Sequence, residues 1–304
     1  VDSELKPLKQ AMETLQADRN SLSKTIGKAS PEEREALKEK VGQIKAELDQ
    51  KTEQARTLQE EFDSLMLLVP QPARDDVPVG KDDNDNVEVK VWGPVPEFSF
   101  KAKDHVQLGE SLGLIDIPRG VKLAGSRSYI LTGWGARLEQ AVLRFTYDLL
   151  CERGFTPLTV PVLVREDAMV GTGYFPTGRD QAYCVEKDEL ALVGTSEVSL
   201  TSYHAGEMLQ EKDLPVRIMA QSSCFRREAG TYGKDTSGLY RVHQFQKVEQ
   251  VIIGPNDPAQ SEAFHNELLG NAEAILQALE LPYRVVYVCT GDLGQGQLRK
   301  HDIE

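Results

Sequence analysis

The first 68 residues repeat apolar side chains at alternating spacings of three and four, and no other feature limits the possible fold as much. A heptad repeat sustained over this length is typical of a coiled-coil seam, in which each helix presents a narrow apolar stripe to its partner. The first series consists of Leu5, Leu8, Met12, Leu15, Leu22 and Ile26. The second series consists of Leu37, Val41, Ile44, Leu48, Ala55, Leu58, Phe62 and Leu65. Arg19 and Lys51 fill the polar positions of the two series, and we predict two helices.

A short connection between the two series carries helix-ending and helix-starting signals. Gly27 suits the end of the first helix, while Ser30, Pro31 and Glu33 suit an N-cap, a first helical position and a capping box. So short a connection makes the helices antiparallel neighbours. The second helix, at residues 31–68, would span roughly 55 Å and be longer than the first. We expect that residues preceding Val1 are missing, or that the unpaired end of the second helix docks on another domain.

Basic residues gather around this connection, although the whole chain has a net charge of −13. Between Arg19 and Lys45 there are seven Lys or Arg residues against four Glu residues. The acidic total argues against non-specific coating of DNA but does not exclude a local basic patch. Two interpretations stay open, a solvated helical face or a projecting tip that grips phosphates.

The sequence argues against several classes of protein and site. No apolar run approaches the ~20 residues of a membrane-spanning helix, and the start of the chain lacks the order of a signal peptide. The four cysteines are far apart and show no CxxC pairing, so we expect reduced thiols and no zinc site. Gly171 and Gly173 begin a glycine pattern, but Pro176 stands where a dinucleotide fingerprint needs its third glycine. No GxxxxGK[ST] phosphate loop occurs.

After the helical region, the composition changes to a linker and then to a mixed domain. Residues 70–96 are rich in Pro and Asp, which predicts a linker with a short strand at 87–91. Prolines in the predicted strand at 155–164 indicate an edge or interface strand. The other predicted elements are helices at 135–153, 198–208 and 258–280 and strands at 190–193 and 283–289. Without a regular βαβ repeat, we predict an α+β fold: an arm at 1–69, the linker at 70–96, and an antiparallel sheet flanked by helices at 97–304.

A polar hairpin predicted at residues 222–249 holds the candidate chemistry. Arg226 follows its first strand, a Gly-rich loop comes next, and the second strand ends at Glu249. Side chains two apart share one face of a strand, so Phe245, Lys247 and Glu249 should lie together. Arginine forks bind phosphate, and an aromatic ring can stack on a base. A cradle for a nucleotide and a small cation is one interpretation, and salt bridges inside an ordinary sheet are the other.

At these residues the chain resembles the class II aminoacyl-tRNA synthetases, and among them the bacterial seryl-tRNA synthetase family. The resemblance covers essentially all 304 residues. Phe225-Arg226-Arg227-Glu228 matches the FRxE signature of motif 2, which is a weak signal alone. It becomes specific when joined to the strand that follows, to the Thr195-Ser196-Glu197 turn and to the amino-terminal hairpin. Residues 135–161 resemble motif 1, the helix and Pro-ended strand that build the dimer interface of the family.

The resemblance implies roles for individual residues. Serine recognition would fall to Thr195, Ser196, Glu197, Arg226 and Glu249. ATP would be bound by Arg226, Arg227, Glu228, Val242, His243, Gln244 and Phe245, with the adenine stacked on Phe245. The catalytic residues would be Arg226, Glu228 and Arg241. These residues would serve a cytoplasmic ATP-dependent ligase that forms seryl-adenylate and transfers the seryl group to the 3′ end of tRNA(Ser).

The resemblance also implies a macromolecular partner and a metal ion. The arm would bind tRNA(Ser) across a homodimer through Arg19, Lys24, Lys28, Arg34 and Lys38. The family pattern continues past Glu304 into a strand with a Mg²⁺ ligand and into motif 3, so we expect the chain as given to be inactive alone. Two alternatives stay open, a non-catalytic tRNA-binding or regulatory paralog and another class II synthetase with a helical arm.

Overall fold

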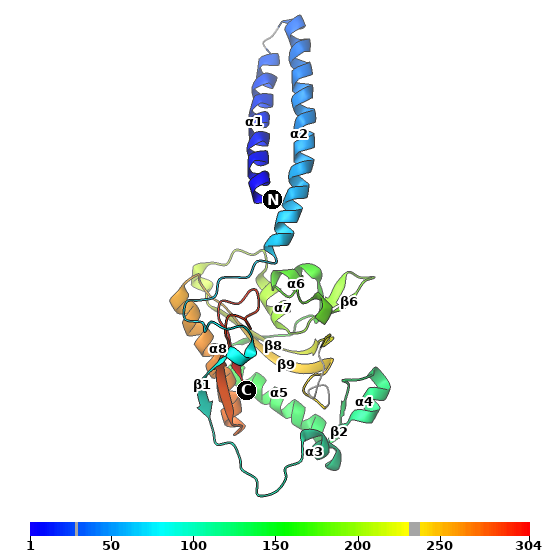
Figure 1. Cartoon of the computed structure of the whole chain (residues 1–304), viewed down its shortest axis with the longest axis vertical. Helices are drawn as coiled ribbons and strands as arrows, with labels where there is room; N and C mark the ends of the chain where they lie inside the picture. Colours follow the sequence, from blue (N-terminus) through cyan, green and yellow to red (C-terminus); the bar gives the residue numbers. More distant parts are fainter. Residues whose placement is uncertain (28–29, 231–237) are drawn as a thin grey trace. The chain divides into compact units, whose positions relative to one another are not determined.

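The computed structural model describes residues 1–27, 30–230 and 238–304, and these form two compact units. The first unit is Val1–Pro70 and the second is Gln71–Glu304 (Figure 1). Within the described part of the chain, no helix is long and apolar enough to cross a membrane.

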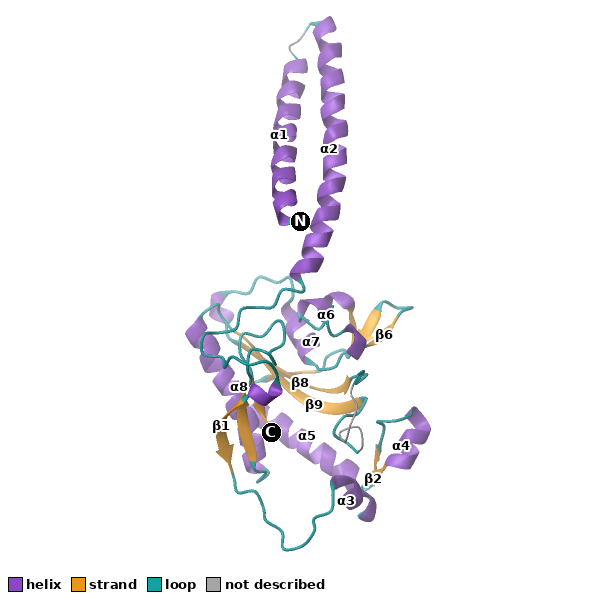
Figure 2. Ribbon diagram, viewed as in Figure 1, coloured by secondary structure: helices purple, strands orange, loops and turns teal. Residues whose placement is uncertain are grey.

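The first unit is the antiparallel helical hairpin that the heptads predict (Figure 2). Helix α1 covers Asp2–Ile26 and helix α2 covers Pro31–Met66. Ser30 caps α2 by accepting a hydrogen bond from the backbone of Glu33, whose carboxylate in turn accepts one from the backbone N–H of Ser30. This is the predicted capping box, with proline in the first turn. The seam is also confirmed, because Leu5, Leu48 and Ala55 are buried and the polar slots are half-buried.

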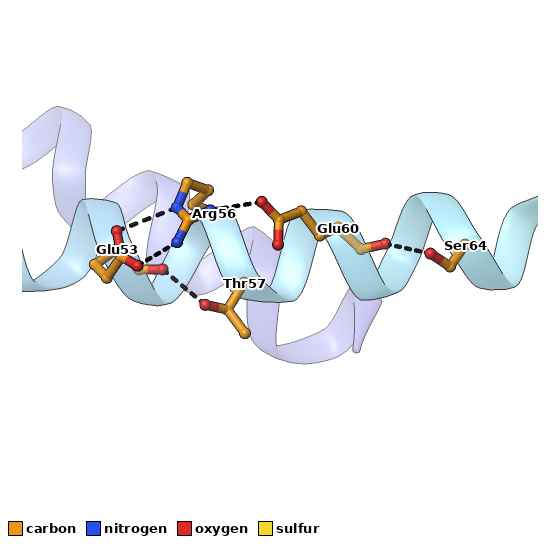
Figure 3. A network of polar contacts seen from close by, with 5 residues as sticks. All are labelled: Glu53, Arg56, Thr57, Glu60 and Ser64. Carbon is orange, nitrogen blue, oxygen red and sulfur yellow. Dashed lines mark hydrogen bonds and ion pairs between the residues drawn. The ribbon is translucent and has the colours of Figure 1, made fainter. Parts of the chain in front are cut away.

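The outer face of α2 is polar and is stabilised by contacts within one helix. Arg56 donates from Nε to Glu53 at 3.1 Å and from Nη1 to Glu60 at 2.8 Å (Figure 3). Each pair is three or four residues apart, where side chains of a helix are neighbours, and such exposed pairs add little to stability because water and salt screen them. At the end of α2, Leu65 and Met66 are about half exposed.

A three-stranded sheet in the order β4-β8-β9 forms the centre of the second unit. Strands β8 (Val216–Phe225) and β9 (Gln244–Ile253) are antiparallel along their whole lengths, as predicted for the hairpin. Strand β4 (Thr156–Leu158) is an edge strand, as its proline indicates, but it runs parallel to β8. The predicted single strand at 155–164 is wrong. The strand ends between Pro157 and Pro161, and the polypeptide then enters another sheet as β5 (Leu163–Arg165).

Three smaller sheets surround this centre. Strand β7 (Leu190–Leu192) lies between β5 and β6 (Tyr183–Val185). Strand β10 (Tyr283–Tyr287) lies between β1 (Val87–Trp92) and β11 (His301–Ile303), so the strand predicted inside residues 70–96 is part of the second unit. Strands β2 (Ile115–Asp116) and β3 (Ile130–Leu131) form a pair. All these pairings are antiparallel, which confirms the α+β prediction.

Helices pack on both faces of β8 and β9. Helices α5 (Trp134–Glu152) and α8 (Pro258–Ala278) cover one face around Met219, and α7 (Glu197–Thr201) covers the other around Ile218. Helix α7 is shorter than the predicted 198–208, because a 3₁₀ turn, Ser202–His204, follows it. The remaining helices are α3 (His105–Ser111), α4 (Ile117–Ala124) and α6 (Glu166–Gly171). Further 3₁₀ turns are Asp83–Asp85, Arg179–Gln181 and Glu211–Asp213.

Candidate functional site

The alternation of β9 decides which of its side chains meet α7. Val248 and Ile252 pack with α5 and α8, whereas Val251 packs with α7. Because side chains alternate across a strand, the odd-numbered residues of β9 face the α7 side. The sequence predicted this shared face, which carries Phe245 and Glu249.

A closed set of polar contacts forms where β9 meets the start of α7. The hydroxyl of Thr195, which is 6% exposed, donates to Glu249 Oε2 at 2.8 Å. Thr195 Oγ1 also accepts hydrogen bonds from Lys247 Nζ at 2.8 Å and from the backbone N–H of Glu197 at 3.2 Å. Lys247 and Glu249 also form an ion pair. A hydroxyl has one donor and two acceptor positions, so the hydrogen-bonding capacity of Thr195 is filled.

Lys247 is a member of this cluster that the sequence reasoning placed on the right face but did not count among the site residues. Its spacing of two from both Phe245 and Glu249 is the signal that could have identified it. The ammonium belongs here because it neutralises a half-buried carboxylate and fills an acceptor position of Thr195. Ser196, also predicted, is fully buried, and its hydroxyl has no hydrogen-bond partner among the described residues.

Glu197 completes the acidic side of the cluster and lines a cavity of about 590 Å³ together with Glu249. The residue is open to solvent through this cavity, but the protein atoms around its carboxyl still raise the carboxyl's pKa by desolvation. The negative charge of Glu249 raises this pKa further, and Lys247 opposes the shift. Two carboxylates and one ammonium therefore leave the cluster with a surplus of negative charge.

Arg226 lies on the same face of the hairpin as the polar cluster. Its Nε donates to the carbonyl oxygen of Gly194 at 3.2 Å, and its guanidinium carbon lies 5.1 Å from the centre of the Phe245 ring. Gly194 makes room for the ring of Tyr174, because a Cβ there would clash with the Tyr174 hydroxyl, whereas its contact with Arg226 Cγ would be an ordinary one. The structure therefore brings Arg226 and Phe245 together, with the guanidinium over one face of the ring.

Arg227, Glu228 and Arg241 lie between β8 and β9, outside the paired residues of the two strands. Glu228 has a left-handed backbone with φ of 51°, and its carboxylate lies 3.6 Å from Arg241. Arg226, Glu228 and Arg241 line one cavity of about 730 Å³. Arg227 is exposed.

Backbone hydrogen bonds hold the residues that lead into β9. Val242 is buried, and the carbonyl of His243 accepts from the backbone of Arg226 at 3.0 Å. Nδ1 of His243 lies 3.0 Å from the carbonyl oxygen of Arg226. Gln244 is exposed and lines a cavity of about 590 Å³ together with His243 and Phe245.

The predicted arm residues belong to the first unit. Lys24, Arg34 and Lys38 are exposed, and Lys38 pairs with Glu35 at 2.8 Å. Arg19 is half-buried in the seam, and Lys28 lies outside the described residues. As for metals, residues 1–27, 30–230 and 238–304 contain no group of three or more His, Cys, Asp or Glu that could hold an ion.

Comparisons with known proteins identify two family profiles in this chain. The profile described as "Seryl-tRNA synthetase N-terminal domain" matches residues 1–72. The profile described as "tRNA synthetase class II core domain (G, H, P, S and T)" matches residues 183–304, which include the β8–β9 hairpin.

Relatives and solved structures match the whole chain. It is 45% identical over 303 residues to the serine–tRNA ligase of Deinococcus radiodurans, covering 100% of this chain and 71% of that protein. It is 42% identical over 311 residues to the serine–tRNA ligase of Leptospira biflexa, covering 100% and 73%. The structure of seryl-tRNA synthetase from Pyrococcus horikoshii complexed with ATP superposes with a TM-score of 0.91 at 38% identity, covering 100% and 72%. The cytoplasmic serine–tRNA ligase of Naegleria fowleri in complex with AMP gives 0.84 at 27% identity, covering 99% and 70%.

Proposed function

The chain belongs to the seryl-tRNA synthetase family, and on this premise we propose how its residues activate serine and charge tRNA(Ser). It is an ATP-dependent ligase that joins L-serine to the 3′ end of tRNA(Ser) through seryl-adenylate. The observation that carries the assignment of roles is the Thr195–Lys247–Glu249 cluster, which lies on the same face of the hairpin as Arg226 and Phe245.

The polar cluster is the proposed serine pocket. Glu249 accepts a hydrogen bond from the substrate hydroxyl, and Glu197 faces the substrate ammonium. Thr195 and Ser196 form the floor of the pocket between them. A pocket built to bond a hydroxyl rejects alanine, because alanine leaves these polar groups unpaired. The acceptors are already held in place by Thr195 and Lys247, so binding requires little rearrangement.

Arg226 joins the serine pocket to the proposed nucleotide pocket. Its guanidinium binds the serine carboxylate and the α-phosphate, and thereby holds the attacking oxygen in line with phosphorus. Adenine stacks on Phe245, with the backbone of Val242 beside the base. Arg227, His243 and Gln244 line the nucleotide, while Glu228 orients Arg241 toward the terminal phosphates. Fixed positive charge stabilises the transition state, and no side-chain nucleophile is needed.

Mg²⁺ remains a prediction for this reaction. Mg²⁺ usually takes some of its ligands from nucleotide phosphates, so phosphate oxygens of ATP would supply part of its coordination. When bound, it would neutralise phosphate charge. The residue roles proposed above do not depend on it.

The helical hairpin is the proposed tRNA-binding arm. The exposed cations Lys24, Arg34 and Lys38 surround the tip, where they can contact phosphates. Arg19 belongs to the seam and contributes positive charge from there, and Lys28 adds a cation by sequence. Binding through phosphates and shape suits a structured RNA.

We further propose a cytoplasmic homodimer in which the arm of one subunit presents tRNA to the other. Helix α5 exposes Trp134 (71%) and Leu138 (62%), large apolar side chains of the kind that protein interfaces cover. Light scattering on the purified protein tests the dimer, and a monomer at micromolar concentration would contradict it.

Amino-acid-dependent exchange of pyrophosphate into ATP tests the proposed activity. We expect exchange with serine for the enzyme expressed from its intact gene, at a kcat/KM at least about 1,000-fold above that for alanine, because the unpaired pocket penalises the analogue. Exchange with threonine or phenylalanine in place of serine would indicate another class II synthetase. No exchange with any amino acid, together with retained tRNA binding, would indicate a non-catalytic paralog.

A further inference from the structure

Gln181 forms hydrogen bonds with the backbone of the segment that follows β8, where the pairing of β8 with β9 has ended. The backbone N–H of Arg227 donates to the carbonyl oxygen of Gln181 at 2.8 Å. The Gln181 side chain then bonds Ala229 twice, since its Nε2 donates to the Ala229 carbonyl and its Oε1 accepts from the Ala229 N–H, both at 3.0 Å. A side-chain amide with one donor and one acceptor thus mimics a neighbouring β-strand.

These three bonds flank the residue with the strained backbone. Glu228 lies between the two residues that Gln181 holds, and its φ of 51° is uncommon for a side chain of this kind. Such a conformation persists only when the surrounding structure over-determines it. The left-handed turn places the carboxylate 3.6 Å from Arg241, at the cavity that Arg226 also lines.

The returning limb of the hairpin has separate supports. The backbone N–H of His243 donates to the carbonyl of Arg127 at 3.2 Å, and that of Leu239 donates to His105 Nε2 at 3.0 Å. Among the described residues, Gln181 forms no hydrogen bond with His243, with Leu239 or with the Thr195–Lys247–Glu249 cluster. Loss of its amide should therefore displace the outgoing limb selectively.

We propose that Gln181 is a positioning residue for ATP, which fixes the backbone of residues 227–229 so that Glu228 and Arg241 meet the nucleotide phosphates. This inference rests on the nucleotide role proposed above for the outgoing limb. It assigns no contact between Gln181 and substrate. The side chain acts through the backbone that it holds.

Gln181→Met tests the proposal, because methionine keeps the length of the side chain and removes both amide hydrogen bonds. In serine-dependent pyrophosphate exchange we expect KM for ATP to rise about tenfold, as two hydrogen bonds that fix the limb are lost. KM for serine should stay within twofold of the parent. Gln181→Glu keeps the acceptor for the Ala229 N–H but sets a carboxylate oxygen against the Ala229 carbonyl, so we expect KM for ATP to rise at least as much.

Gln277→Met is the matched control. The Gln277 amide donates to the Tyr283 hydroxyl at 2.7 Å, at the end of α8, and its loss should lower Tm without changing KM for ATP. The proposal is overturned if Gln181→Met leaves KM for ATP unchanged, or raises both KM values equally. If Gln181→Met does not fold, Gln181→Glu decides by the same criterion. An inactive parent enzyme would refute the proposed function instead.

Discussion

Replacing Thr195 by valine removes one hydroxyl while keeping the shape of the side chain. In the structure this hydroxyl donates to Glu249 and accepts from Lys247 and from the backbone of Glu197. The site is 6% exposed, so a methyl group there leaves the three partners facing an apolar surface. Lys247 and Glu249 keep their mutual ion pair, and the cavity beside Glu249 admits solvent. The cost is therefore lower than that of a fully orphaned charge.

The magnitude follows from these contacts. Losing a neutral hydrogen bond costs about 1 kcal/mol and losing one to a charged group costs about 1.5–3 kcal/mol, before solvent compensates. We expect a loss of about 2–3 kcal/mol in transition-state stabilisation, which corresponds to a decrease of roughly 30- to 150-fold in kcat/KM for serine. Serine-dependent pyrophosphate exchange at saturating ATP measures this decrease, and KM for ATP should change less than threefold.

Thr195→Ser is the matched control, because it keeps the hydroxyl and removes only the methyl group. We expect it to retain at least a third of the parent kcat/KM. Two results would refute the reasoning: Thr195→Val within twofold of the parent, or Thr195→Ser as impaired as Thr195→Val. The first would show that the hydroxyl does not organise the pocket, and the second that packing outweighs it.

Three further predictions concern the nucleotide, acid stability and the arm. Phe245→Leu should raise KM for ATP about tenfold in pyrophosphate exchange, because stacking on a base is worth about 1–3 kcal/mol, and an unchanged KM would contradict the stacking role. Burial, followed by nearby positive charge, lowers the pKa of His265 from its ordinary 6.5 to about 4, so the unfolded chain binds the extra proton as pH falls from 6.5 toward 4. The free energy of unfolding should drop by about 2 kcal/mol over this pH range, after a discount for solvent screening. His265→Gln should flatten this pH dependence in urea unfolding, whereas an unchanged pH dependence would exclude His265 as its source. Reversing Lys24, Arg34 and Lys38 to Glu should weaken tRNA charging at least tenfold and leave serine activation intact, and an equal loss of activation would contradict the arm assignment.

Local patterns predicted the first unit almost completely. A heptad seam and a capping box depend on residues three to seven apart, so the sequence alone specifies where α1 ends, where α2 begins and which side chains are buried. The β8–β9 hairpin was also predictable, because alternation on one strand placed Phe245 and Glu249 together. The meeting of this face with Thr195 was expected only from the resemblance to the synthetase family.

Contacts between distant segments were beyond the reach of these patterns. The break near Pro161 and the parallel pairing of β4 depend on which strand is the neighbour, which a single apolar run does not encode. Gln181 shows the same limit, since it lies 48 residues from Ala229 in sequence, and its role depends on a turn that brings the two together. Polar side chains that substitute for a strand carry no periodic signal.

The charge balance of the serine pocket suggests why a free amino acid fits it. Glu197 and Glu249 carry two negative charges against the single positive charge of Lys247, and this surplus contributes to the raised pKa of Glu197. In the proposed complex the ammonium of serine would neutralise the surplus, while the carboxylate meets Arg226 on the nucleotide side. The pocket thus orients a zwitterion from both ends before its hydroxyl is tested by Glu249. In this proposal the ammonium and the hydroxyl of serine are recognised by different carboxylates, which interact with each other because the charge of Glu249 raises the pKa of Glu197.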